Sequence, residues 1–453
     1  MIAALLLLQE PTAEPAERPT PPSISLLRFP EDYSGIEGTT AADDWWSDWK
    51  DIPLGRDGDW RASFGIELRA QGEAYTGDGL GTEEEQLEYI WWRALPVAEV
   101  RNGGFRAFVQ GILAYETGLQ VEPAPIDVDR GDFLQAFAEA TVDLEGAEWR
   151  TRFGRQLVLL GTGRLVSIRY GPNVLQTFDG VRSRYGNDDW SVEALWMRPV
   201  EVEEGAFDDE ANSEEVLYGL YSTVDLGPSN LDLYWLGHED DEVTYDSGTA
   251  DIQRQTLGAR VHGRRGNLDW NWEAFYQFGD FGSQDIQAWS LAADTGYRFE
   301  SLPFEPRAFL RTAIISGDDD PTDGTLETFD PLFPRGKYFG EIGIIGPANL
   351  INAHLGLQAD VGEQWAVESN LIAYWRESTD DGVYNNPVQV LRPGNLSDAR
   401  YIGTQFDILA EWSPDRNWAV GGAYSFLAPG EFVEETGEDG VVQFFQLYTR
   451  FWF

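Results

Sequence analysis

The sequence feature that most constrains the fold of this chain is an alternation of apolar and polar residues that starts at Trp60. Every second residue over 60–70 is apolar, and the residues between are Arg, Ser, Gly, Glu and Arg. Residues 268–278 repeat the pattern with Trp270 and Tyr276 on the apolar side. Successive side chains of a β-strand point to opposite faces, so each segment predicts a strand with one apolar and one polar face. A soluble β-sandwich gives the same alternation, so the pattern alone does not choose an architecture.

The lengths of the connections between the predicted strands indicate which architecture the chain adopts. We delimit eighteen segments, which cover residues 60–75, 87–101, 105–116, 133–144, 147–156, 178–186, 190–199, 215–226, 230–239, 253–263, 268–278, 286–298, 306–316, 350–361, 365–376, 400–412, 417–427 and 442–453. Short turns follow the even-numbered segments and longer loops, up to residues 317–349, follow the odd-numbered ones. An even strand number with this rhythm is typical of outer-membrane barrels. The sequence therefore predicts an all-β chain forming a single transmembrane antiparallel β-barrel of about 18 strands, with both termini in the periplasm.

Two positions inside these segments carry extra information. The last segment ends in Phe453, which shares one face with Phe451 and Phe445. A terminal Phe that closes an alternating aromatic strand resembles the signal recognised by the barrel assembly machinery, so we expect that machinery to be a partner. Pro96 lies inside the second segment and lacks a backbone donor, so we expect a β-bulge there.

Composition excludes several classes of protein. The net charge of −46 argues against nucleic-acid binding, which needs a basic surface. The chain has no cysteine, and its three histidines show no metal-ligand spacing. Neither a nucleophile elbow nor a phosphate-binding loop is present, and acids are too numerous to single out a glycosidase pair. We therefore expect no enzyme activity and no cofactor.

The first residues indicate export from the cytoplasm. Residues 3–8 are Ala-Ala-Leu-Leu-Leu-Leu, small residues lie near Ala13, and no basic residue precedes Arg18. Residues 1–13 are therefore interpreted as a truncated signal peptide, with a disordered leader as the alternative. We expect residues 14–44 to be a flexible leader rich in Pro and Glu, and residues 45–453 to form the barrel.

Arginines concentrate on the face predicted to line the lumen. Only Lys50 and Lys337 are lysines among the 32 basic residues. On two adjacent segments, four arginines face one another: Arg150, Arg152, Arg182 and Arg184. Such a cluster is repulsive unless anions lie between the guanidiniums, and the planar guanidinium binds carboxylates with two parallel hydrogen bonds. The pattern favours anion passage, and bracing by lumen carboxylates is the alternative.

Two predicted loops are too apolar to remain in solvent. Residues 157–177 and 317–349 are long and rich in Leu, Gly and Phe. Loops of this length and composition usually pack against something. Folding into the barrel would bring four basic residues to a constriction: Arg164, Arg169, Arg335 and Lys337. The alternatives are that the loops extend the strands or cap the mouth.

The other long links are acidic. They cover residues 201–215, 239–251, 317–323 and 431–439, and we interpret them as a solvated outer surface. Asp318, Asp320 and Asp323 could hold Ca²⁺ through carboxylate oxygens, although their spacing does not match an EF-hand loop.

Two long motifs resemble the alginate export family. Residues 161–173 read Gly-Thr-Gly-Arg-Leu-Val-Ser-Ile-Arg-Tyr-Gly-Pro-Asn, between Gly-Arg-Gln at 154–156 and Phe-Asp-Gly-Val-Arg at 178–182. Residues 330–340 read Asp-Pro-Leu-Phe-Pro-Arg-Gly-Lys-Tyr-Phe-Gly and precede Gly-Pro-Ala-Asn-Leu at 346–350. The resemblance implies a monomeric eighteen-stranded barrel with an Arg-rich, loop-constricted pore for a secreted polyuronate. It implies functional roles at matching positions: Arg155, Arg164, Arg169, Asn173, Asp179, Arg182, Arg335 and Lys337.

The function expected on this basis is export of an anionic, alginate-like polysaccharide through the outer membrane of a Gram-negative cell, with periplasmic export proteins as expected partners. The scarcity of lysine and the acidity of the other loops depart from the family pattern. Two alternatives remain open at this point. One is a diffusion or uptake porin for small anionic solutes or sugar acids. The other is a secreted β-rich carbohydrate-active enzyme, against which the terminal Phe453 argues.

Overall fold

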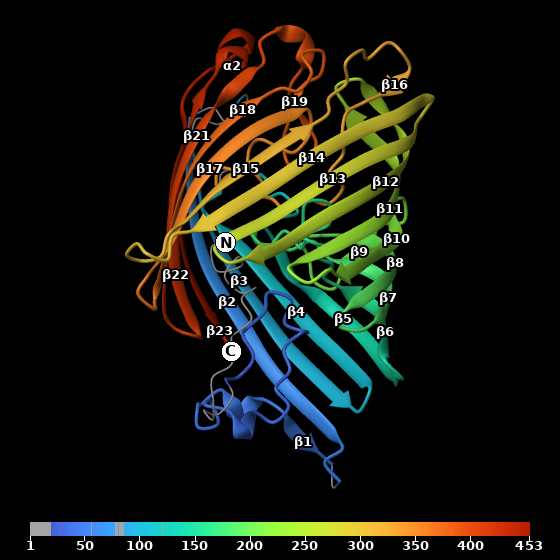
Figure 1. Cartoon of the computed structure of the whole chain (residues 1–453), viewed down its shortest axis with the longest axis vertical. Helices are drawn as coiled ribbons and strands as arrows, with labels where there is room; N and C mark the ends of the chain where they lie inside the picture. Colours follow the sequence, from blue (N-terminus) through green and yellow to red (C-terminus); the bar gives the residue numbers. More distant parts are fainter. Residues whose placement is uncertain (1–19, 56, 78–79, 81–85, 120) are drawn as a thin grey trace.

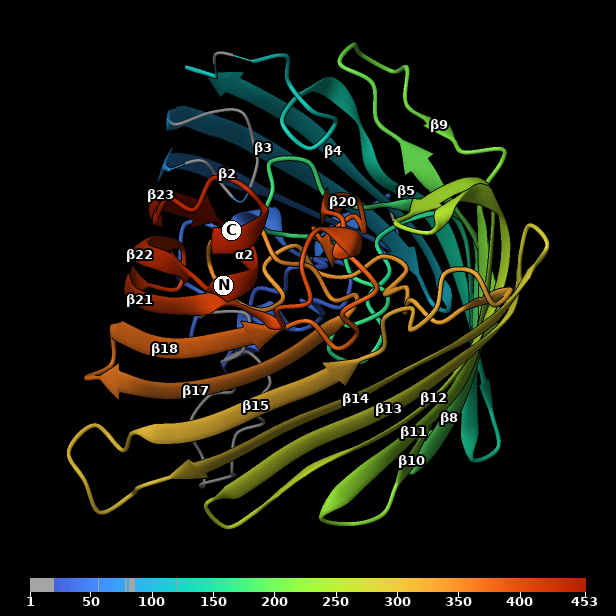
Figure 2. The same cartoon turned by 90° about the horizontal axis from the view of Figure 1, so that it is seen from above.

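The computed structural model of the chain describes residues 20–55, 57–77, 80, 86–119 and 121–453. Within these ranges, eighteen long strands form one closed antiparallel barrel (Figures 1 and 2). The barrel strands are β2 (Trp60–Thr76), β3 (Gln86–Asn102), β4 (Phe105–Thr117), β5 (Asp129–Leu144), β6 (Ala147–Gln156), β7 (Phe178–Gly186), β8 (Trp190–Glu201), β10 (Val216–Asp225), β11 (Ser229–Tyr245), β12 (Gly248–Arg265), β13 (Leu268–Phe281), β14 (Gln284–Arg298), β15 (Arg307–Ile315), β17 (Leu350–Val361), β18 (Trp365–Trp375), β21 (Tyr401–Asp415), β22 (Trp418–Pro429) and β23 (Val442–Trp452). The barrel closes where β2 pairs with β23, from Glu67 opposite Trp452 to Thr76 opposite Gln443. The predicted fold class and strand number are confirmed.

Short elements lie at the two ends of the barrel. They are β1 (Ile52–Leu54), β9 (Glu210–Ala211), β16 (Thr325–Leu326), β19 (Val383–Tyr384), β20 (Val390–Arg392), the helix α2 (Glu431–Thr436) and three 3-10 turns at Ile36–Gly38, Ser47–Trp49 and Gly394–Leu396. No helix among the described residues is long and apolar enough to cross a membrane.

We call the two ends of the barrel the turn end and the loop end. At the turn end, links such as residues 103–104 and 266–267 are tight, and β1 and Phe453 lie there, in the lower part of Figure 1. At the loop end, shown at the top of Figure 1 with α2 and β19, most links are long. Two loop-end links are tight instead, at residues 246–247 and 282–283. The acidic loop predicted over 239–251 is therefore mostly strand, because its charged residues hid the continuation of β11 and β12.

The bulge predicted at Pro96 is wrong. Pairing between β3 and β4 skips two positions there, from Ala94 opposite Leu113 to Val97 opposite Gln110, but the register is unchanged. The register shifts one strand farther along, between β4 and β5 beside Gln110. A missing backbone donor thus removes ladder hydrogen bonds without adding a residue to the strand.

The two faces of the wall differ as the alternation predicts. On β2, Glu67 and Arg69 face the lumen and are 3% and 5% exposed, whereas Leu68 between them is 42% exposed on the outer face. Five tryptophans near turn-end strand termini are between 36% and 52% exposed, and they are Trp149, Trp190, Trp365, Trp412 and Trp418. Apolar residues and interfacial aromatics on the outer face fit contact with membrane lipid.

Both long apolar loops fold into the barrel, as Figure 2 shows from above. In the first, Leu157, Val158 and Val166 are fully buried. Val166 forms a parallel bridge with Phe333 of the second loop, and the Phe333 amide donates to the Leu165 carbonyl at 2.8 Å. The contacting parts of the two loops therefore form one body inside the lumen, which confirms inward folding there. Thr325–Leu326 of the second loop instead form β16, which pairs with β14.

The N-terminal leader packs against the barrel over its described part. The prediction covered residues 14–44, and residues 14–19 and the predicted signal at 1–13 lie outside the described residues. Within 20–44, Arg28, Tyr33 and Ile36 are 4–5% exposed. They pack against the turn end of the barrel, where arginines and aromatic rings of the wall supply partners that the composition of the leader did not indicate.

Candidate functional site in the barrel lumen

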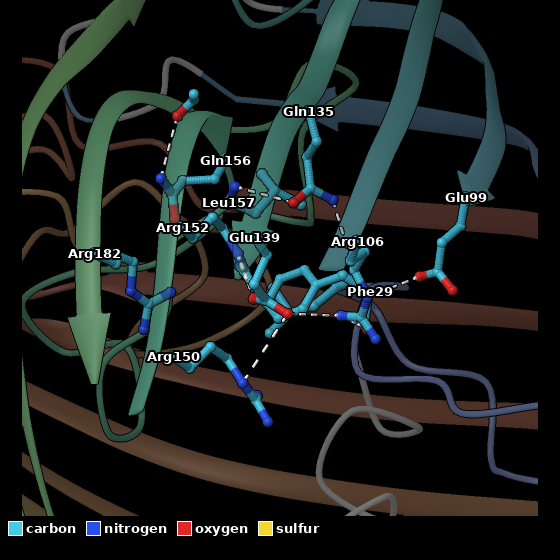
Figure 3. Close-up of polar contacts among 12 residues, drawn as sticks. Phe29, Glu99, Arg106, Gln135, Glu139, Arg150, Arg152, Gln156, Leu157 and Arg182 are labelled. Carbon is cyan, nitrogen blue, oxygen red and sulfur yellow. Dashed lines mark hydrogen bonds and ion pairs between the residues drawn. The ribbon is translucent and has the colours of Figure 1, made fainter. Parts of the chain in front are cut away.

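The four arginines predicted to face one another do so. Arg150 is opposite Arg184 and Arg152 is opposite Arg182 across the β6–β7 ladder. Figure 3 shows Arg150, Arg152 and Arg182 on the inner wall together with Glu139. We call this set, with the neighbouring Arg106, the turn-end arginine patch.

Glutamates lie between these guanidiniums. Arg152 binds Glu139 at 2.6 Å and Arg182 binds Glu193 at 2.7 Å. Arg150 binds Glu148 at 2.7 Å. Glu139 also forms ion pairs with Arg106 at 3.3 Å and Arg150 at 4.0 Å. Among the described residues no ion pair is found for Arg184, so the patch keeps an excess of positive charge although most of its members are braced.

The first inward loop is held by arginines of the wall. Arg69 and Arg93 donate to the backbone carbonyls of residues 170–173, at 2.8 Å from Arg69 to Pro172 and 3.0 Å from Arg93 to Pro172. The Tyr170 hydroxyl donates to Glu67 at 2.9 Å. Part of the lumen arginine content therefore positions the loop that narrows the lumen.

The predicted basic residues of this loop differ in their partners. Arg164 binds Glu273 on β13 at 2.7 Å. Arg169 has a left-handed backbone, with φ of 47°, and its Nε donates to the carbonyl of Pro334 at 3.1 Å. Arg164 thus ties the loop to the wall, and Arg169 ties it to the second loop.

The second loop brings basic residues to a small cavity of about 40 Å³ in the lumen. Arg311, Arg335, Lys337 and His354 line it together with Glu341 and Glu368. Lys337 binds Glu341 at 3.3 Å, and Arg311 binds Asp294 at 2.7 Å. Arg335 has no ion pair among the described residues, and its Nε is buried without a hydrogen-bond partner.

Three predicted site residues do not face the lumen passage. Arg155 has the same parity on β6 as Phe153, which is 68% exposed on the outer face. Its guanidinium binds Asp179 at 3.0 Å and donates to the backbone carbonyl of Asp209. Asn173 is fully buried, and its amide donates to three backbone carbonyls. These side chains hold the loop end together, and parity along β6 separates Arg155 from Arg150 and Arg152.

The calcium candidates are not gathered around one point. Asp320 accepts from Thr322, and Asp323 accepts from the Thr325 amide. Asp318 is buried beside Asp381, and its carboxylate accepts from the Asp320 amide at 3.2 Å. The acid and histidine groups that do converge in the described part of the chain are Glu215 with His238 and Asp240, and Asp132 with Asp208 and Asp209.

Several residues of the site were not singled out from the sequence. Phe29 lies over Arg152 with 3.8 Å between the ring centroid and the guanidinium carbon. Arg101 binds Asp32 at 3.0 Å, at the same end of the barrel. The alternation could have indicated Arg101, which has the parity of Arg93. Nothing in the sequence signals Phe29, because it lies outside the strands.

Comparisons with known proteins agree with this geometry. The model of the family described as alginate export matches residues 60–443. Solved structures similar to the chain include Acinetobacter baumannii OccAB1, with 10% identity and a TM-score of 0.59 over 86% of this chain and 96% of that one. A BenF-like porin from Pseudomonas fluorescens Pf-5 has 10% identity and a TM-score of 0.59 over 86% and 98% of the two chains.

A third similar structure is Pseudomonas aeruginosa OccK2 (OpdF) in complex with glucuronate, with 12% identity and a TM-score of 0.56 over 86% of this chain and 96% of that one. At such identities the likeness concerns the fold. A search of curated protein sequences finds no match.

Proposed function

The chain belongs to the alginate export family and forms an outer-membrane channel, and from that premise we propose that it passes an anionic, alginate-like polyuronate out of the cell. In this proposal the turn end faces the periplasm, with both termini there, and the loop end faces the outside. The polymer enters at the turn-end arginine patch and leaves past the constriction made by the two inward loops.

The observation that carries the proposal is the guanidinium of Arg335 in the constriction, which has no ion pair in the described part of the chain. Basic side chains of a protein interior are normally paired with acids. A half-buried arginine without an acidic partner offers two parallel donors to a passing carboxylate. A chain of uronic acids presents one carboxylate on every sugar, so successive residues of the polymer can use the same site.

Braced arginines suit transport as well as they suit stability. Conduction requires sites that attract the cargo and still release it. In the patch, Glu139 and Glu193 already hold the guanidiniums, so a polymer carboxylate must share them with a resident acid. Sharing weakens each contact and favours several weak sites over one tight site. We propose these roles for Arg150, Arg152, Arg182, Arg184, Arg335 and Lys337.

A second candidate is uptake of small sugar acids. The glucuronate in the OccK2 structure is a single uronic acid, and the cavity at Arg335 in this chain is small. Both candidates need the same carboxylate chemistry, so they differ in the size of the cargo and in the direction of transport.

Four further roles belong to the proposal. Residues 1–13 act as a signal peptide. The barrel assembly machinery recognises the strand that ends at Phe453. Periplasmic export proteins deliver the polymer to the turn end. The acidic loop-end residues form a solvated outer surface.

The test is a single-channel recording in a planar bilayer. Oligomers of a polyuronate and neutral oligosaccharides of the same length are added to one side at a time. We expect anion selectivity in a salt gradient and block by the polyuronate alone. Block by single sugar acids without block by oligomers would favour the uptake porin, and equal block by neutral sugars would reject both candidates.

A further inference from the structure

The described N-terminal segment lies across the lumen at the turn end without joining the sheet between residues 22 and 33. Four wall side chains donate to its backbone carbonyls: Arg416 to Pro22 at 2.9 Å, Gln135 to Leu27 at 3.1 Å, Arg106 to Phe29 at 2.9 Å and Arg101 to Glu31 at 2.5 Å. These donors come from β3, β4, β5 and the β21–β22 link, so the segment is held along one arc of the wall.

The groups that the segment offers to the wall are of the kinds that a uronic acid chain carries. Arg101 takes a carboxylate from Asp32 and a carbonyl oxygen from Glu31. The ring of Phe29 covers Arg152 at 3.8 Å and also meets Phe137, so it occupies the space above the guanidinium that a ligand would need. Polyuronates present carboxylates, other oxygens and ring faces in repeating order.

The wall beneath the segment is short of acids. Its guanidiniums belong to Arg101, Arg106, Arg150, Arg152, Arg182 and Arg184, whereas the wall acids that bind them are Glu99, Glu139, Glu148 and Glu193. Asp32 and the carbonyl oxygens of the segment supply part of what is missing. A ligand rich in carboxylates would supply it more fully.

The segment is attached in two different ways along its length. From Tyr33 onward it is anchored, because Tyr33, Ile36 and Trp46 form a buried cluster and β1 pairs with β2. Before Tyr33 the contacts are side-chain hydrogen bonds, ring contacts and the packing of Leu26 and Leu27 against the first inward loop. Three of the four donors are guanidiniums, which can exchange a carbonyl of the segment for an oxygen of another ligand, so residues 22–32 can leave while the anchor stays.

We infer that residues 22–32 are an internal mimic of the polymer, seated in a polyuronate-binding site formed by Arg101, Arg106 and Arg152, and that this site binds the polymer only when the segment withdraws. The inference rests on the proposed function and names the entrance of the same channel. The segment keeps the entrance closed to the periplasm until a carboxylate-rich chain competes for the arginines.

The test uses a reversible tether. The chain has no cysteine, so Pro22→Cys with Arg416→Cys creates one thiol pair. A short bis-methanethiosulfonate reagent joins the pair through two disulfides with loss of methanesulfinate, and a reducing agent cleaves it. The control pair is Asp51→Cys with Arg61→Cys, whose native side chains bind at 2.6 Å inside the anchor. Both full-length channels are recorded before and after cleavage, with polyuronate hexamers added at the turn end.

Cleavage at the first pair should raise chloride conductance and lower the half-blocking polyuronate concentration at least tenfold, whereas cleavage at the control pair should change neither. Equal conductance and equal block before and after cleavage at the first pair would overturn the inference. A rise in conductance without polyuronate block in either state would overturn the proposed function, and with it the ligand named here, while the movement of the segment would stand.

Discussion

The ring of Phe29 lies over the guanidinium of Arg152, with 3.8 Å between the ring centroid and the guanidinium carbon, and the same guanidinium binds Glu139 at 2.6 Å. One arginine thus joins the wall of the barrel to the segment that crosses its entrance. Both contacts are desolvated, since the side chains of Arg152 and Glu139 are 6% and 5% exposed. Arg152 therefore contributes both to the packing of the wall and to the seating of the N-terminal segment.

The first prediction concerns Arg152→Ala. Glu139 keeps Arg106 as a partner at 3.3 Å, so the loss of stability should be about 1–3 kcal/mol rather than the larger cost of an abandoned buried charge. Anion selectivity should fall because the patch loses one guanidinium. The unfolding temperature and the reversal potential in a salt gradient measure the two effects. The control is Arg130→Ala, which removes an exposed arginine paired with Glu204 and should change neither the unfolding temperature nor the reversal potential. An unchanged reversal potential in Arg152→Ala would contradict the prediction.

The second prediction concerns the anchor of the first inward loop. The Asn173 amide donates to the carbonyls of Trp92, Tyr115 and Asp127 at 3.4, 3.0 and 2.8 Å. Asn173→Ala leaves these acceptors without their donor, which costs about 1–3 kcal/mol. The loop should then leave the lumen part of the time, and single-channel conductance should rise with longer open events. Gln176→Ala, which loses a bond to the neighbouring Thr177 only, is the matched control; a conductance equal to wild type in Asn173→Ala would place the loop outside the permeation path.

The third prediction concerns pH at the loop end. Burial, together with the charges of Asp381, Glu327 and Asp323, raises the pKa of Asp318 to about 7. The unfolded chain releases this proton near pH 4, so folding retains a proton between pH 4 and 7 and stability falls as the pH rises through that window. Asp318→Asn should therefore flatten the decline and raise the unfolding temperature at pH 8. Thermal melts from pH 4 to 8 measure it, and an identical slope in the variant would show that Asp318 does not cause the decline.

The strands could be predicted because the environment imposes a simple rule on each of them. Lipid outside and polar groups inside produce an alternation that sequence shows directly, as at Leu68 between Glu67 and Arg69. The same alternation places the four patch arginines on the inner face. Arg155 lies on β6 an odd number of residues from Arg150 and Arg152, so the alternation places it on the outer face. The family resemblance assigned Arg155 and Asp179 to the pore, whereas the alternation along β6 assigns Arg155 to the outer face. The structure agrees with the alternation.

The contacts of the leader could not be predicted, since they have no periodicity. Wall side chains bind its backbone carbonyls, which every residue carries, so the sequence of residues 22–32 does not mark them. The pairing of each arginine was hidden for a related reason. Alternation gives the face of a side chain, but the choice of Glu139 or Glu193 as partner depends on the registers of the three strand pairs from β5 to β8.

The fourth prediction concerns Phe453. Its amide and carbonyl exchange hydrogen bonds with Ile66 at 3.1 and 3.3 Å, and its ring meets Trp45. Deletion of Phe453 should lower the amount of barrel in the outer membrane, because closure against β2 loses its last pair. Phe453→Ala keeps the backbone pair and tests the ring alone. Heat-modifiable mobility on gels of outer-membrane fractions measures both, at equal transcript levels, and full insertion of the deletion variant would show that the terminal residue is dispensable.

The last prediction separates passage from bracing in the constriction. Arg335 has no ion pair among the described residues, whereas Arg164 binds Glu273 at 2.7 Å. A charge pair at 4 Å is worth about 4 kcal/mol at an effective dielectric near 20, before desolvation and screening over roughly 8 Å reduce it. Arg335→Ala should therefore lower anion selectivity and weaken polyuronate block, by about two- to tenfold after screening.

The stability of Arg335→Ala should stay near that of wild type, because none of the described acids loses an ion-pair partner. Arg164→Ala is the matched variant. It removes one guanidinium from the first loop and leaves Glu273 with the Tyr234 hydroxyl at 2.6 Å, so its unfolding temperature should fall. If Arg335→Ala lowers stability and preserves both selectivity and block, Arg335 holds the loop in place and the cargo does not use its charge.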